Sequence, residues 1–374
     1  MRFLFACGGT GGHINPAIAV AKLIEEKRKE SEILFVGVNG GMETRLVPDS
    51  GFAIKTIDVS GVSRKKGIGG LVSNISAVKK LFSAEKAARR ILEEFKPDVV
   101  IGTGGYACYP TLRSATRLGI PTVVHEANAY PGLATRRLAK AVTRVLLNFE
   151  AGAERLPKKT SFAVVGNPIR GDILLYDREK AREELGITKP LLVSFWGSLG
   201  AREMNNHIAE FMRLEKESGC DFCHIHACGK FGYEWMPALL EEKGVTTDGS
   251  DGIWLREYID DMPRVLAAAD VVMCRGGAGT LSEIGATGKP AIIVPSPNVT
   301  DNHQYKNALE LKKIGGAIVF EEKDVTPSIL LDAAKELLSD AEKRSVMSSA
   351  LVENAVLDAS EKIYSEIMNV IKRK

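Results

Sequence analysis

Four glycine-rich segments of the chain have the composition of phosphate-binding turns. Three of them, residues 8–13, 102–105 and 197–200, each come directly after a short apolar run that predicts a β-strand. Where a strand leads into a helix, backbone N–H groups and the positive end of the helix dipole point at one place, and glycine lets a phosphate approach them. Together the turns indicate phosphate handling, although any one of them is also compatible with a tight turn that binds nothing.

The fourth segment, residues 274–283, is more informative. It follows the predicted strand Val271–Cys274 and begins a helix at about Ala278. The backbone N–H groups of Gly279 and Thr280 could hold a diphosphate there. Glu283 lies about one turn further on, where a carboxylate can accept hydrogen bonds from two ribose hydroxyls. The helix dipole also favours an acid in any first turn, so that both interpretations of Glu283 remain open.

The spacing of these glycines argues against two common nucleotide-binding classes. No Gly-Lys-Ser/Thr follows any of the turns, so none is a Walker loop, and the first turn lacks the Gly-x-Gly-x-x-Gly pattern of dinucleotide sites. An NAD-dependent enzyme is therefore disfavoured.

Cysteine and histidine residues gather between residues 220 and 228 in a pattern that resembles a zinc cluster. The stretch predicts a strand, on which successive side chains point to opposite faces. Cys223 then points away from His224 and His226, and one ion could not collect these ligands at tetrahedral distances. We expect no metal and no cofactor.

The elements that position these turns alternate regularly along the chain. Amphipathic helical stretches, such as residues 18–26 and 208–217, separate short β-branched runs, which predicts parallel sheets with helices on both faces. Because the second set of runs repeats the organisation of the first, we expect an α/β protein with two Rossmann-like domains. The runs that predict strands are Arg2–Ala6, 33–36, 99–101, 122–124, Arg144–Leu147, Leu191–Phe195, 222–227, Val271–Cys274 and 291–294.

The expected boundary lies at Gly166-Asn167-Pro168, where a short apolar run ends in residues that break regular structure. It divides the chain into an N-terminal domain of residues 1–165 and a C-terminal domain of residues 166–355. Residues 356–374 would form a C-terminal helix that either caps the second domain or returns to the first.

Composition fits a two-domain protein of the cytoplasm. The 374 residues are 45% hydrophobic, and no run approaches the roughly 18 apolar residues that span a bilayer. The apolar start of the chain is too short for a signal peptide. Six cysteines in a chain of this length indicate reduced thiols.

Charge is distributed unevenly. Residues 1–165 contain 25 Lys and Arg against 14 Asp and Glu, a balance of +11, whereas the rest contains 50 − 25 = 25 against 47 − 14 = 33, a balance of −8. The first half is therefore expected to meet something anionic, unless its solvated faces differ only by chance. No nucleic-acid-binding signature accompanies the basic half, so we expect no nucleic acid partner.

With these motifs in place, the chain resembles the MurG family, whose members add N-acetylglucosamine to the lipid-linked precursor of peptidoglycan. The resemblance extends over nearly the whole length. The segments that carry it are residues 8–13 with Asn15-Pro16, 104–106, 125–128, 165–170, 197–202, 258–262, 275–283 and 303–308.

The resemblance implies a GT-B fold with the active site in the cleft between the domains, and a C-terminal domain that binds UDP-N-acetylglucosamine. The backbone of Ile259 would read uracil, Glu283 would bind the ribose, and Arg170 falls at a donor-binding position. The remaining implied contacts are Ser198 with Ala278, Gly279, Thr280, Leu281 and Ser282 at the diphosphate, Asn128 and Gln304 at the sugar hydroxyls, and Thr10, Gly11 and Gly12 lining the cleft from the other domain.

The same resemblance implies the acceptor. It would be undecaprenyl-pyrophosphoryl-MurNAc-pentapeptide (lipid I), converted to lipid II with inversion at the anomeric carbon. Two positions depart from the family pattern: Trp196 stands where glycine is usual, and Ala127 stands where Gln is common. Trp196 puts the backbone approach at the third turn in doubt.

Inverting transfer needs a base for the acceptor hydroxyl. We hypothesise that His13 is this base, since imidazole titrates near neutral pH. In the competing interpretation His13 orients the turn or contacts the acceptor pyrophosphate as a cation.

A lipid-linked acceptor requires work at a bilayer surface, and we expect a peripheral protein on the cytoplasmic face of the cell membrane. An apolar stripe at helical spacing, flanked by cations, could lie in an anionic interface or pack on the domain's own sheet. The stripe consists of Leu71, Ile75, Val78 and Phe82, and the cations are Arg64, Lys65, Lys66, Lys79, Lys80, Lys86, Arg89 and Arg90.

Three other functions share these features. A related GT-B enzyme could glycosylate another lipid, a UDP-N-acetylglucosamine 2-epimerase would isomerise the sugar nucleotide without an acceptor, and a binding subunit would not catalyse. The basic stripe argues against the epimerase, and the motifs in both halves argue against a binding subunit.

Overall fold

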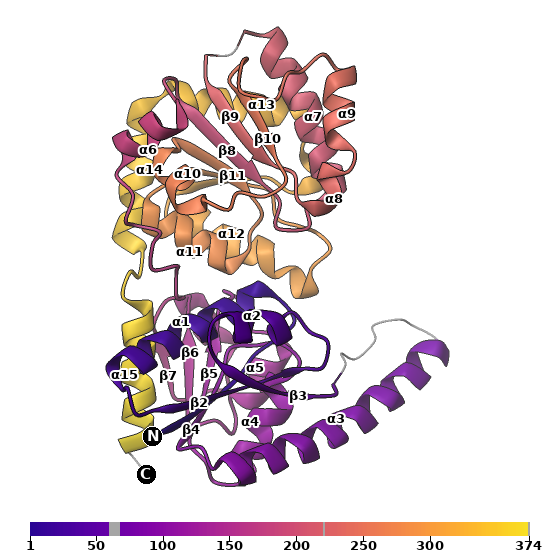
Figure 1. Cartoon of the computed structure of the whole chain (residues 1–374), viewed down its shortest axis with the longest axis vertical. Coiled ribbons are helices and arrows are strands. Elements are labelled where there is room, and N and C mark those ends of the chain that lie inside the picture. The colour runs from indigo at the N-terminus through magenta and orange to yellow at the C-terminus, as the bar shows by residue number, and fades with distance from the viewer. Residues whose placement is uncertain (60–67, 220, 373–374) are drawn as a thin grey trace. The chain divides into compact units, whose positions relative to one another are not determined.

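The computed structural model describes residues 1–59, 68–219 and 221–372, with the side chains of residues 68–79 left undescribed. The chain forms two compact units, coloured by residue number in Figure 1. Unit 1 comprises Met1–Ile169 and Val356–Lys374, and unit 2 comprises Arg170–Ala355. The boundary expected between residues 165 and 166 falls just inside unit 1.

Unit 1 contains a parallel seven-stranded sheet of order β3-β2-β1-β4-β5-β6-β7. Its strands are β1 (Arg2–Ala6), β2 (Glu32–Val38), β3 (Ala53–Ile57), β4 (Val99–Gly102), β5 (Thr122–Glu126), β6 (Arg144–Leu147) and β7 (Phe162–Val164). Its helices are α1 (Gly11–Lys27), α2 (Glu43–Asp49), α3 (Ile68–Phe95), α4 (Cys108–Arg117), α5 (Leu133–Leu138), a 3-10 turn (Glu150–Arg155) and α15 (Ala359–Lys372).

Both faces of this sheet are buried, as expected for parallel strands between helical layers. On β1, Phe3 and Phe5 belong to the core beneath α1 and α15, whereas Leu4 and Ala6 belong to the core beneath α3 and α4. This alternation follows from the period of two along a strand and holds the end of β1, where the first glycine turn begins, rigidly between two cores.

Unit 2 contains a parallel six-stranded sheet of order β10-β9-β8-β11-β12-β13. Its strands are β8 (Leu191–Phe195), β9 (Cys223–Ala227), β10 (Ile253–Arg256), β11 (Val271–Cys274), β12 (Ala291–Ile293) and β13 (Ala317–Val319). Its helices are α6 (Arg178–Leu185), α7 (Arg202–Glu217), α8 (Lys230–Tyr233), α9 (Met236–Glu242), α10 (Met262–Ala268), α11 (Ala278–Thr287), α12 (His303–Lys313), α13 (Pro327–Ser339) and α14 (Ala341–Asn354), with 3-10 turns at Thr300–Asn302 and Glu322–Asp324.

The C-terminal tail divides between the units. Helix α14 packs on α11 of unit 2, and α15 packs on α1 of unit 1. Ion pairs hold α15 in place, from Lys27 Nζ to Glu361 at 3.0 Å and from Arg144 Nε to Glu366 at 2.8 Å. In the part of the chain that the structure describes, no helix is long and apolar enough to cross a membrane.

Candidate functional site

The first glycine turn, residues 8–13, encloses a carboxylate that the sequence motifs did not predict. Glu43, the first residue of α2, is fully buried beneath the turn. Its Oε2 accepts from Gly9 N at 3.0 Å and its Oε1 accepts from Val38 N at 2.7 Å. A Cβ at Gly8, Gly37 or Gly41 would collide with the Glu43 side chain, so these glycines make room for an internal anion. The only signal in the sequence is an acid soon after the Gly40-Gly41 pair.

The predicted residues of this turn lie at the start of α1. Thr10 and Gly12 are exposed, and Gly11 is half-buried. Gly11 and Gly12 begin the helix, and the first N–H groups of a helix have no partner within it. A ligand could therefore reach backbone donors here, although Gly9 N is already bonded to Glu43.

His13 lies where the first and second turns meet. Its Nδ1 is 3.1 Å from the carbonyl oxygen of Thr103, and Thr103 Oγ1 donates to the His13 carbonyl at 2.6 Å. A carbonyl only accepts, so Nδ1 carries a proton and the neutral ring keeps its lone pair on Nε2. A Cβ at Gly105 would collide with the Gly8 carbonyl, which shows how closely the turns pack. The fold therefore holds the imidazole in the tautomer that a base acting through Nε2 requires.

Asn128 is organised by a second buried acid, Glu126. Glu126 Oε1 accepts from Asn128 N at 3.1 Å and from Asn128 Nδ2 at 3.0 Å. Its Oε2 accepts from Gly132 N at 3.0 Å and from Thr135 Oγ1 at 2.6 Å. Glu126 thus fixes the loop that carries Asn128. Ala127, the departure in this segment, is buried.

The third turn, residues 197–200, is open despite the bulky Trp196. The Trp196 side chain is buried in the core of unit 2, and the Arg275 guanidinium lies 5.5 Å from its ring. A Cβ at Gly197 would meet nothing within 4 Å, and Gly197 and Ser198 are exposed. The doubt that Trp196 raised about the backbone approach is therefore resolved: the indole points inward and leaves the turn accessible.

The fourth segment forms the start of α11, as the sequence predicts. Gly279 and Thr280 are half-buried, and a Cβ at Gly279 would meet nothing within 4 Å. Leu281 is buried, so only its backbone could serve a ligand. The Ser282 hydroxyl donates to the carbonyl of Ala278 at 2.9 Å, a bond within the helix. The space for a ligand therefore lies over Gly279 and Thr280.

Two of the predicted donor-binding residues are bonded to each other. Arg170 Nε donates to Glu283 Oε1 at 2.9 Å and Nη2 donates to Oε2 at 3.3 Å. Burial raises the pKa of the Glu283 carboxyl, and the Arg170 charge opposes that rise. The pair therefore holds a partly desolvated carboxylate ready to accept hydrogen bonds.

Ile259 and Gln304 complete the predicted set in unit 2. Ile259, between β10 and α10, is buried, so that only its backbone could contact a base. Gln304, on α12, accepts through Oε1 from Ser296 N at 2.9 Å, and its carbonyl packs against Gly276.

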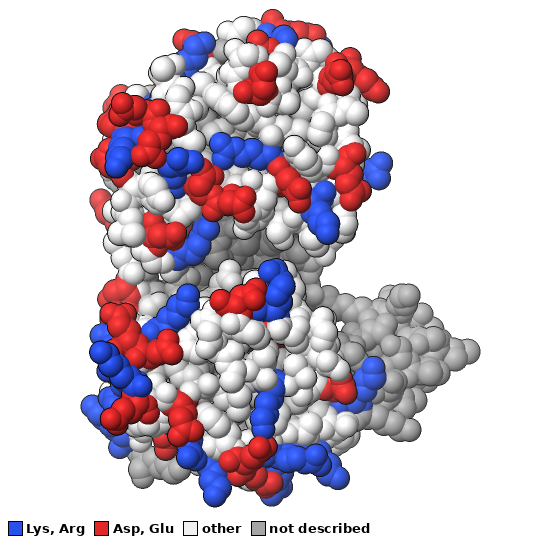
Figure 2. Space-filling model, viewed as in Figure 1, with Lys and Arg blue, Asp and Glu red and all other residues white. Residues whose placement is uncertain are grey.

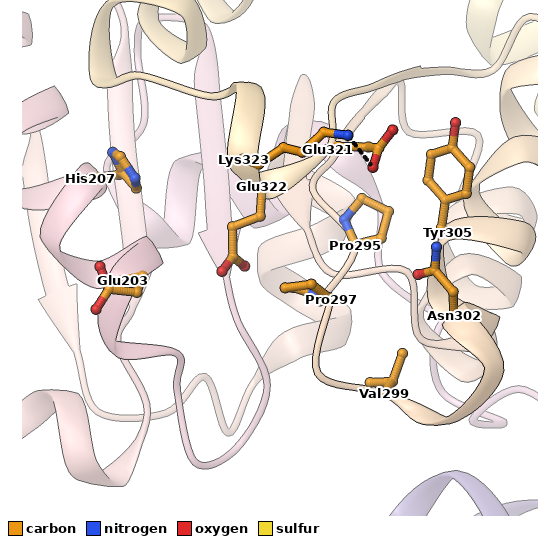
Figure 3. Close-up of a pocket in the computed structure, with 10 residues that line it drawn as sticks. All are labelled: Glu203, His207, Pro295, Pro297, Val299, Asn302, Tyr305, Glu321, Glu322 and Lys323. Carbon is orange, nitrogen blue, oxygen red and sulfur yellow. Dashed lines mark ion pairs between the residues drawn. The ribbon is translucent and has the colours of Figure 1, made fainter.

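A pocket of about 550 Å³ lies in the same unit. Figure 3 shows its two walls: Glu203 and His207 of α7 on one side, and the loop of Pro295, Pro297 and Val299 on the other. The rest of the lining is Asn302, Tyr305, Glu321, Glu322 and Lys323. Of these residues only Tyr305 falls in a sequence motif, the segment 303–308, and none was predicted as a site residue.

The suspected zinc cluster does not form where the structure describes it. His224 and His226 share one face of β9 and both bond to Ser194, whereas Cys220 lies outside the described residues. Among the residues that are described, no group of three or more His, Cys, Asp or Glu could hold a metal ion.

Both halves of the chain match known sequence families. Residues 3–147 match the glycosyltransferase family 28 N-terminal domain, and residues 191–363 match the glycosyltransferase family 28 C-terminal domain. A protein of Acetivibrio thermocellus is 43% identical over 100% of this chain and 99% of its own, and is named UDP-N-acetylglucosamine--N-acetylmuramyl-(pentapeptide) pyrophosphoryl-undecaprenol N-acetylglucosamine transferase. A Bacillus thuringiensis protein with the same name, numbered 2, is 35% identical over the whole of both chains.

The chain belongs to the MurG family. The crystal structure of Acinetobacter baumannii MurG matches with a TM-score of 0.77 and 25% identity, and covers 98% of this chain and 99% of that one. A putative UDP-N-acetylglucosamine 2-epimerase of Listeria monocytogenes matches with a TM-score of 0.69 at 14% identity, covering 100% and 97%, which shows a shared fold alone. The MurG-family chain is thus a glycosyltransferase with the GT-B fold, as its motifs predict.

The membrane stripe predicted for this family member is only partly described. Leu71, Ile75, Val78 and Lys79 belong to the undescribed side chains of α3, and Arg64, Lys65 and Lys66 also lie outside the described residues. Phe82 is 63% exposed, and Lys80, Lys86, Arg89 and Arg90 are exposed. On the face shown in Figure 2, the described Lys and Arg side chains alternate with Asp and Glu in both units.

Proposed function

We propose that this chain transfers N-acetylglucosamine from UDP-N-acetylglucosamine to lipid I, giving lipid II in peptidoglycan synthesis. The observation that carries the proposal is the full-length match to transferases named for this reaction, at 43% and 35% identity. The two parallel sheets support it, because each ends in exposed strand–glycine–helix junctions of the kind that bind phosphate.

Unit 2 would bind the donor. Its diphosphate would lie against Ser198 and the start of α11, where Gly279 and Thr280 leave open space. The ribose hydroxyls would donate to Glu283, and the uracil would meet the backbone of Ile259. Arg170 is already bonded to Glu283, and it would exchange part of that contact for the diphosphate, where its charge stabilises the leaving group.

Unit 1 would bind the acceptor and supply the base. The acceptor oxygen attacks the anomeric carbon as the bond from that carbon to the UDP oxygen breaks, with inversion. The hydroxyl proton passes to His13 Nε2, and the bonding pair leaves with the diphosphate. Support for this role comes from Thr103, whose carbonyl holds Nδ1–H at 3.1 Å and keeps the lone pair on Nε2. Thr10, Gly11 and Gly12 would contact the acceptor pyrophosphate, and Asn128 and Gln304 the sugar hydroxyls.

We further propose that the protein works as a peripheral protein on the cytoplasmic face of the membrane, through α3. The exposed Phe82 supports an interfacial helix over one whose stripe is packed on its own sheet. Four exposed cations close to Phe82 would favour anionic lipid headgroups: Lys80, Lys86, Arg89 and Arg90. No nucleic acid is part of this proposal.

The test is incubation with UDP-N-acetylglucosamine and a short-chain lipid I analogue. We expect equal amounts of UDP and of the disaccharide-linked product, detected by mass spectrometry. Conversion of the sugar nucleotide to its 2-epimer without acceptor would favour the epimerase, and transfer only to another lipid would favour a related glycosyltransferase. Binding of the sugar nucleotide without either reaction would favour a binding subunit.

A further inference from the structure

A chain of buried hydrogen bonds crosses the core of unit 2 between α7 and the sheet. Glu215 Oε2 lies 3.0 Å from His224 Nδ1, and Ser194 Oγ lies 2.7 Å from both His224 Nε2 and His226 Nδ1. His226 Nε2 lies 3.3 Å from Asn205 Oδ1. All five side chains are buried. They are called the polar chain below: Glu215, His224, Ser194, His226 and Asn205.

The fold places these side chains in one row. Ser194 on β8 pairs in register with His226 on β9, and His224 lies two residues earlier on the same face of β9. Asn205 and Glu215 come from opposite ends of α7, ten residues apart and thus about 15 Å along the helix axis. The row therefore runs alongside α7 from its last turn to its first.

The bonds at the Asn205 end are set by the backbone around it. Asn205 Nδ2 donates to the carbonyl of Cys228 at 2.7 Å, so its Oδ1 faces His226 Nε2. Burial lowers the pKa of His226 well below its usual value, so the ring is neutral and carries one proton. Its Nδ1 lies beside two oxygens of Ser194, Oγ at 2.7 Å and the backbone carbonyl at 3.2 Å. Each side chain of the polar chain thus lies within hydrogen-bond distance of the next.

The Asn205 end reaches the third glycine turn. Asn205 holds the Cys228 carbonyl. This carbonyl packs so closely on the turn that a Cβ at Gly200 would collide with its oxygen. The loop after Cys228 then binds the turn directly, because Lys230 N donates to the Ser198 carbonyl at 3.1 Å. The position of Ser198 therefore depends on where Asn205 holds Cys228.

A polar row in this place is not needed to fill the core. The surrounding residues of the same core are apolar, among them Leu192, Met204, Ile208 and Phe211. Buried polar groups lose their hydration and add little net stability, but a fully satisfied network specifies one arrangement of its surroundings. What this network specifies is the spacing between α7, β9 and the third turn.

We propose that the polar chain is a positioning network that fixes the 197–200 turn for the donor diphosphate. The proposal rests on the donor role of that turn stated above. Ser194 and His226 act through Asn205 and Cys228 and touch no substrate. Their loss would let the turn shift, and would weaken diphosphate binding without changing the groups that perform the reaction.

The test compares Ser194→Ala with Val193→Ala in the full-length protein. Val193 is a buried neighbour on the opposite face of β8, so its truncation also disturbs the unit 2 core but leaves the polar chain intact. For Ser194→Ala, which leaves one donor and one acceptor unsatisfied, we expect UDP to bind about tenfold more weakly by calorimetry. The KM for UDP-N-acetylglucosamine should rise in parallel while the KM for the lipid I analogue stays constant. Val193→Ala should leave both binding and KM values unchanged.

Two further measurements keep the proposal open to refutation if Ser194→Ala does not fold. Ser194→Thr retains the hydroxyl and should bind UDP within about twofold of wild type. In the wild type, ¹⁵N chemical shifts of His226 should report a neutral ring with one protonated nitrogen; a doubly protonated ring would overturn the polar chain as described. Equal UDP binding by wild type, Ser194→Ala and Val193→Ala overturns the positioning role alone. No UDP binding by the wild type would overturn the donor site as well.

Discussion

The first and third glycine turns have similar sequences but are supported from below in different ways. In unit 1, the turn at residues 8–13 closes over the Glu43 carboxylate, which takes the Gly9 N–H for itself. In unit 2, the turn at residues 197–200 rests on the polar chain, which ends in the Asn205 amide. One turn therefore has a negative charge directly beneath it, and the other meets an uncharged amide.

This difference bears on what each turn can bind. A carboxylate beneath the first turn offsets part of the positive field of the N-terminus of α1 and repels a second anion placed close to Gly9. The third turn and the start of α11 keep their backbone dipoles for a ligand. The comparison favours unit 2 for the donor diphosphate, which gains charge during the reaction. The acceptor pyrophosphate keeps a constant charge, so the weaker positive field at the first turn of unit 1 would be enough to bind it.

Replacing His13 should have the largest effect, and it should lower turnover without changing donor binding. For His13→Ala we expect kcat to fall by about 10²–10⁴-fold, because the acceptor hydroxyl loses its proton acceptor. UDP binding measured by calorimetry should stay as in the wild type, since the donor site lies in unit 2. Unchanged turnover would sink the base assignment, and weaker UDP binding would contradict the division of labour between the units.

Glu283→Gln should instead weaken donor binding, which His13→Ala leaves unchanged. A neutral amide accepts ribose hydrogen bonds more weakly, and we expect the donor KM to rise by about ten- to a hundredfold with little change in the lipid I KM. Burial raises the pKa of Glu283, so that as pH falls from 8 to 5 the wild-type carboxylate should protonate earlier than an exposed glutamate. Donor affinity should therefore decrease on acidification in the wild type and stay flat in the variant. Parallel pH profiles would remove Glu283 from the donor site.

The sequence predicts the buried strands of both sheets better than it predicts the edge strands. All nine expected strands are present, because central strands of parallel sheets are apolar on both faces. The strands β3, β10 and β13 were missed, and β7 was noted only as the short apolar run at the domain boundary; all four are edge strands. Edge strands are only partly covered; in β3, for example, Lys55 and Thr56 stand between Ile54 and Ile57 and interrupt the apolar run, which gives a weak signal.

The candidate site likewise has parts that local sequence patterns predict and parts that they do not. The positions of the glycine turns were predictable, because each turn needs a local pattern of glycines after a strand. The supporting groups were not: Glu43 reaches Gly9 across 34 residues, and Asn205 reaches Cys228 across 23. Such contacts are set by packing between elements and leave no periodic trace. His224 and His226 illustrate the limit: strand alternation argued against a metal there, but nothing in the sequence predicted that both rings would bond to Ser194.

Glu43→Gln tests whether the buried carboxylate beneath the first turn supports unit 1. A Gln side chain can accept from only one of Gly9 N and Val38 N, and its NH₂ group then faces the other donor. We expect the free energy of unfolding to fall by about 1–3 kcal/mol, measured by urea denaturation. The lipid I KM should rise while UDP binding is retained. Glu25→Gln on the exposed face of α1 should change neither quantity.

The smallest expected effect concerns the surface of unit 1. Lys80 is an exposed cation two residues before the exposed Phe82, whereas Lys180 is an exposed cation of unit 2. If α3 lies at an anionic interface, Lys80→Gln should weaken binding to phosphatidylglycerol-containing vesicles about fivefold, because one basic residue at such a surface contributes about 1 kcal/mol. The matched Lys180→Gln variant should bind as the wild type does. Equal loss in both variants would mean that the vesicles sense only net charge, and unchanged binding of Lys80→Gln would remove α3 from the interface and with it the membrane role of unit 1.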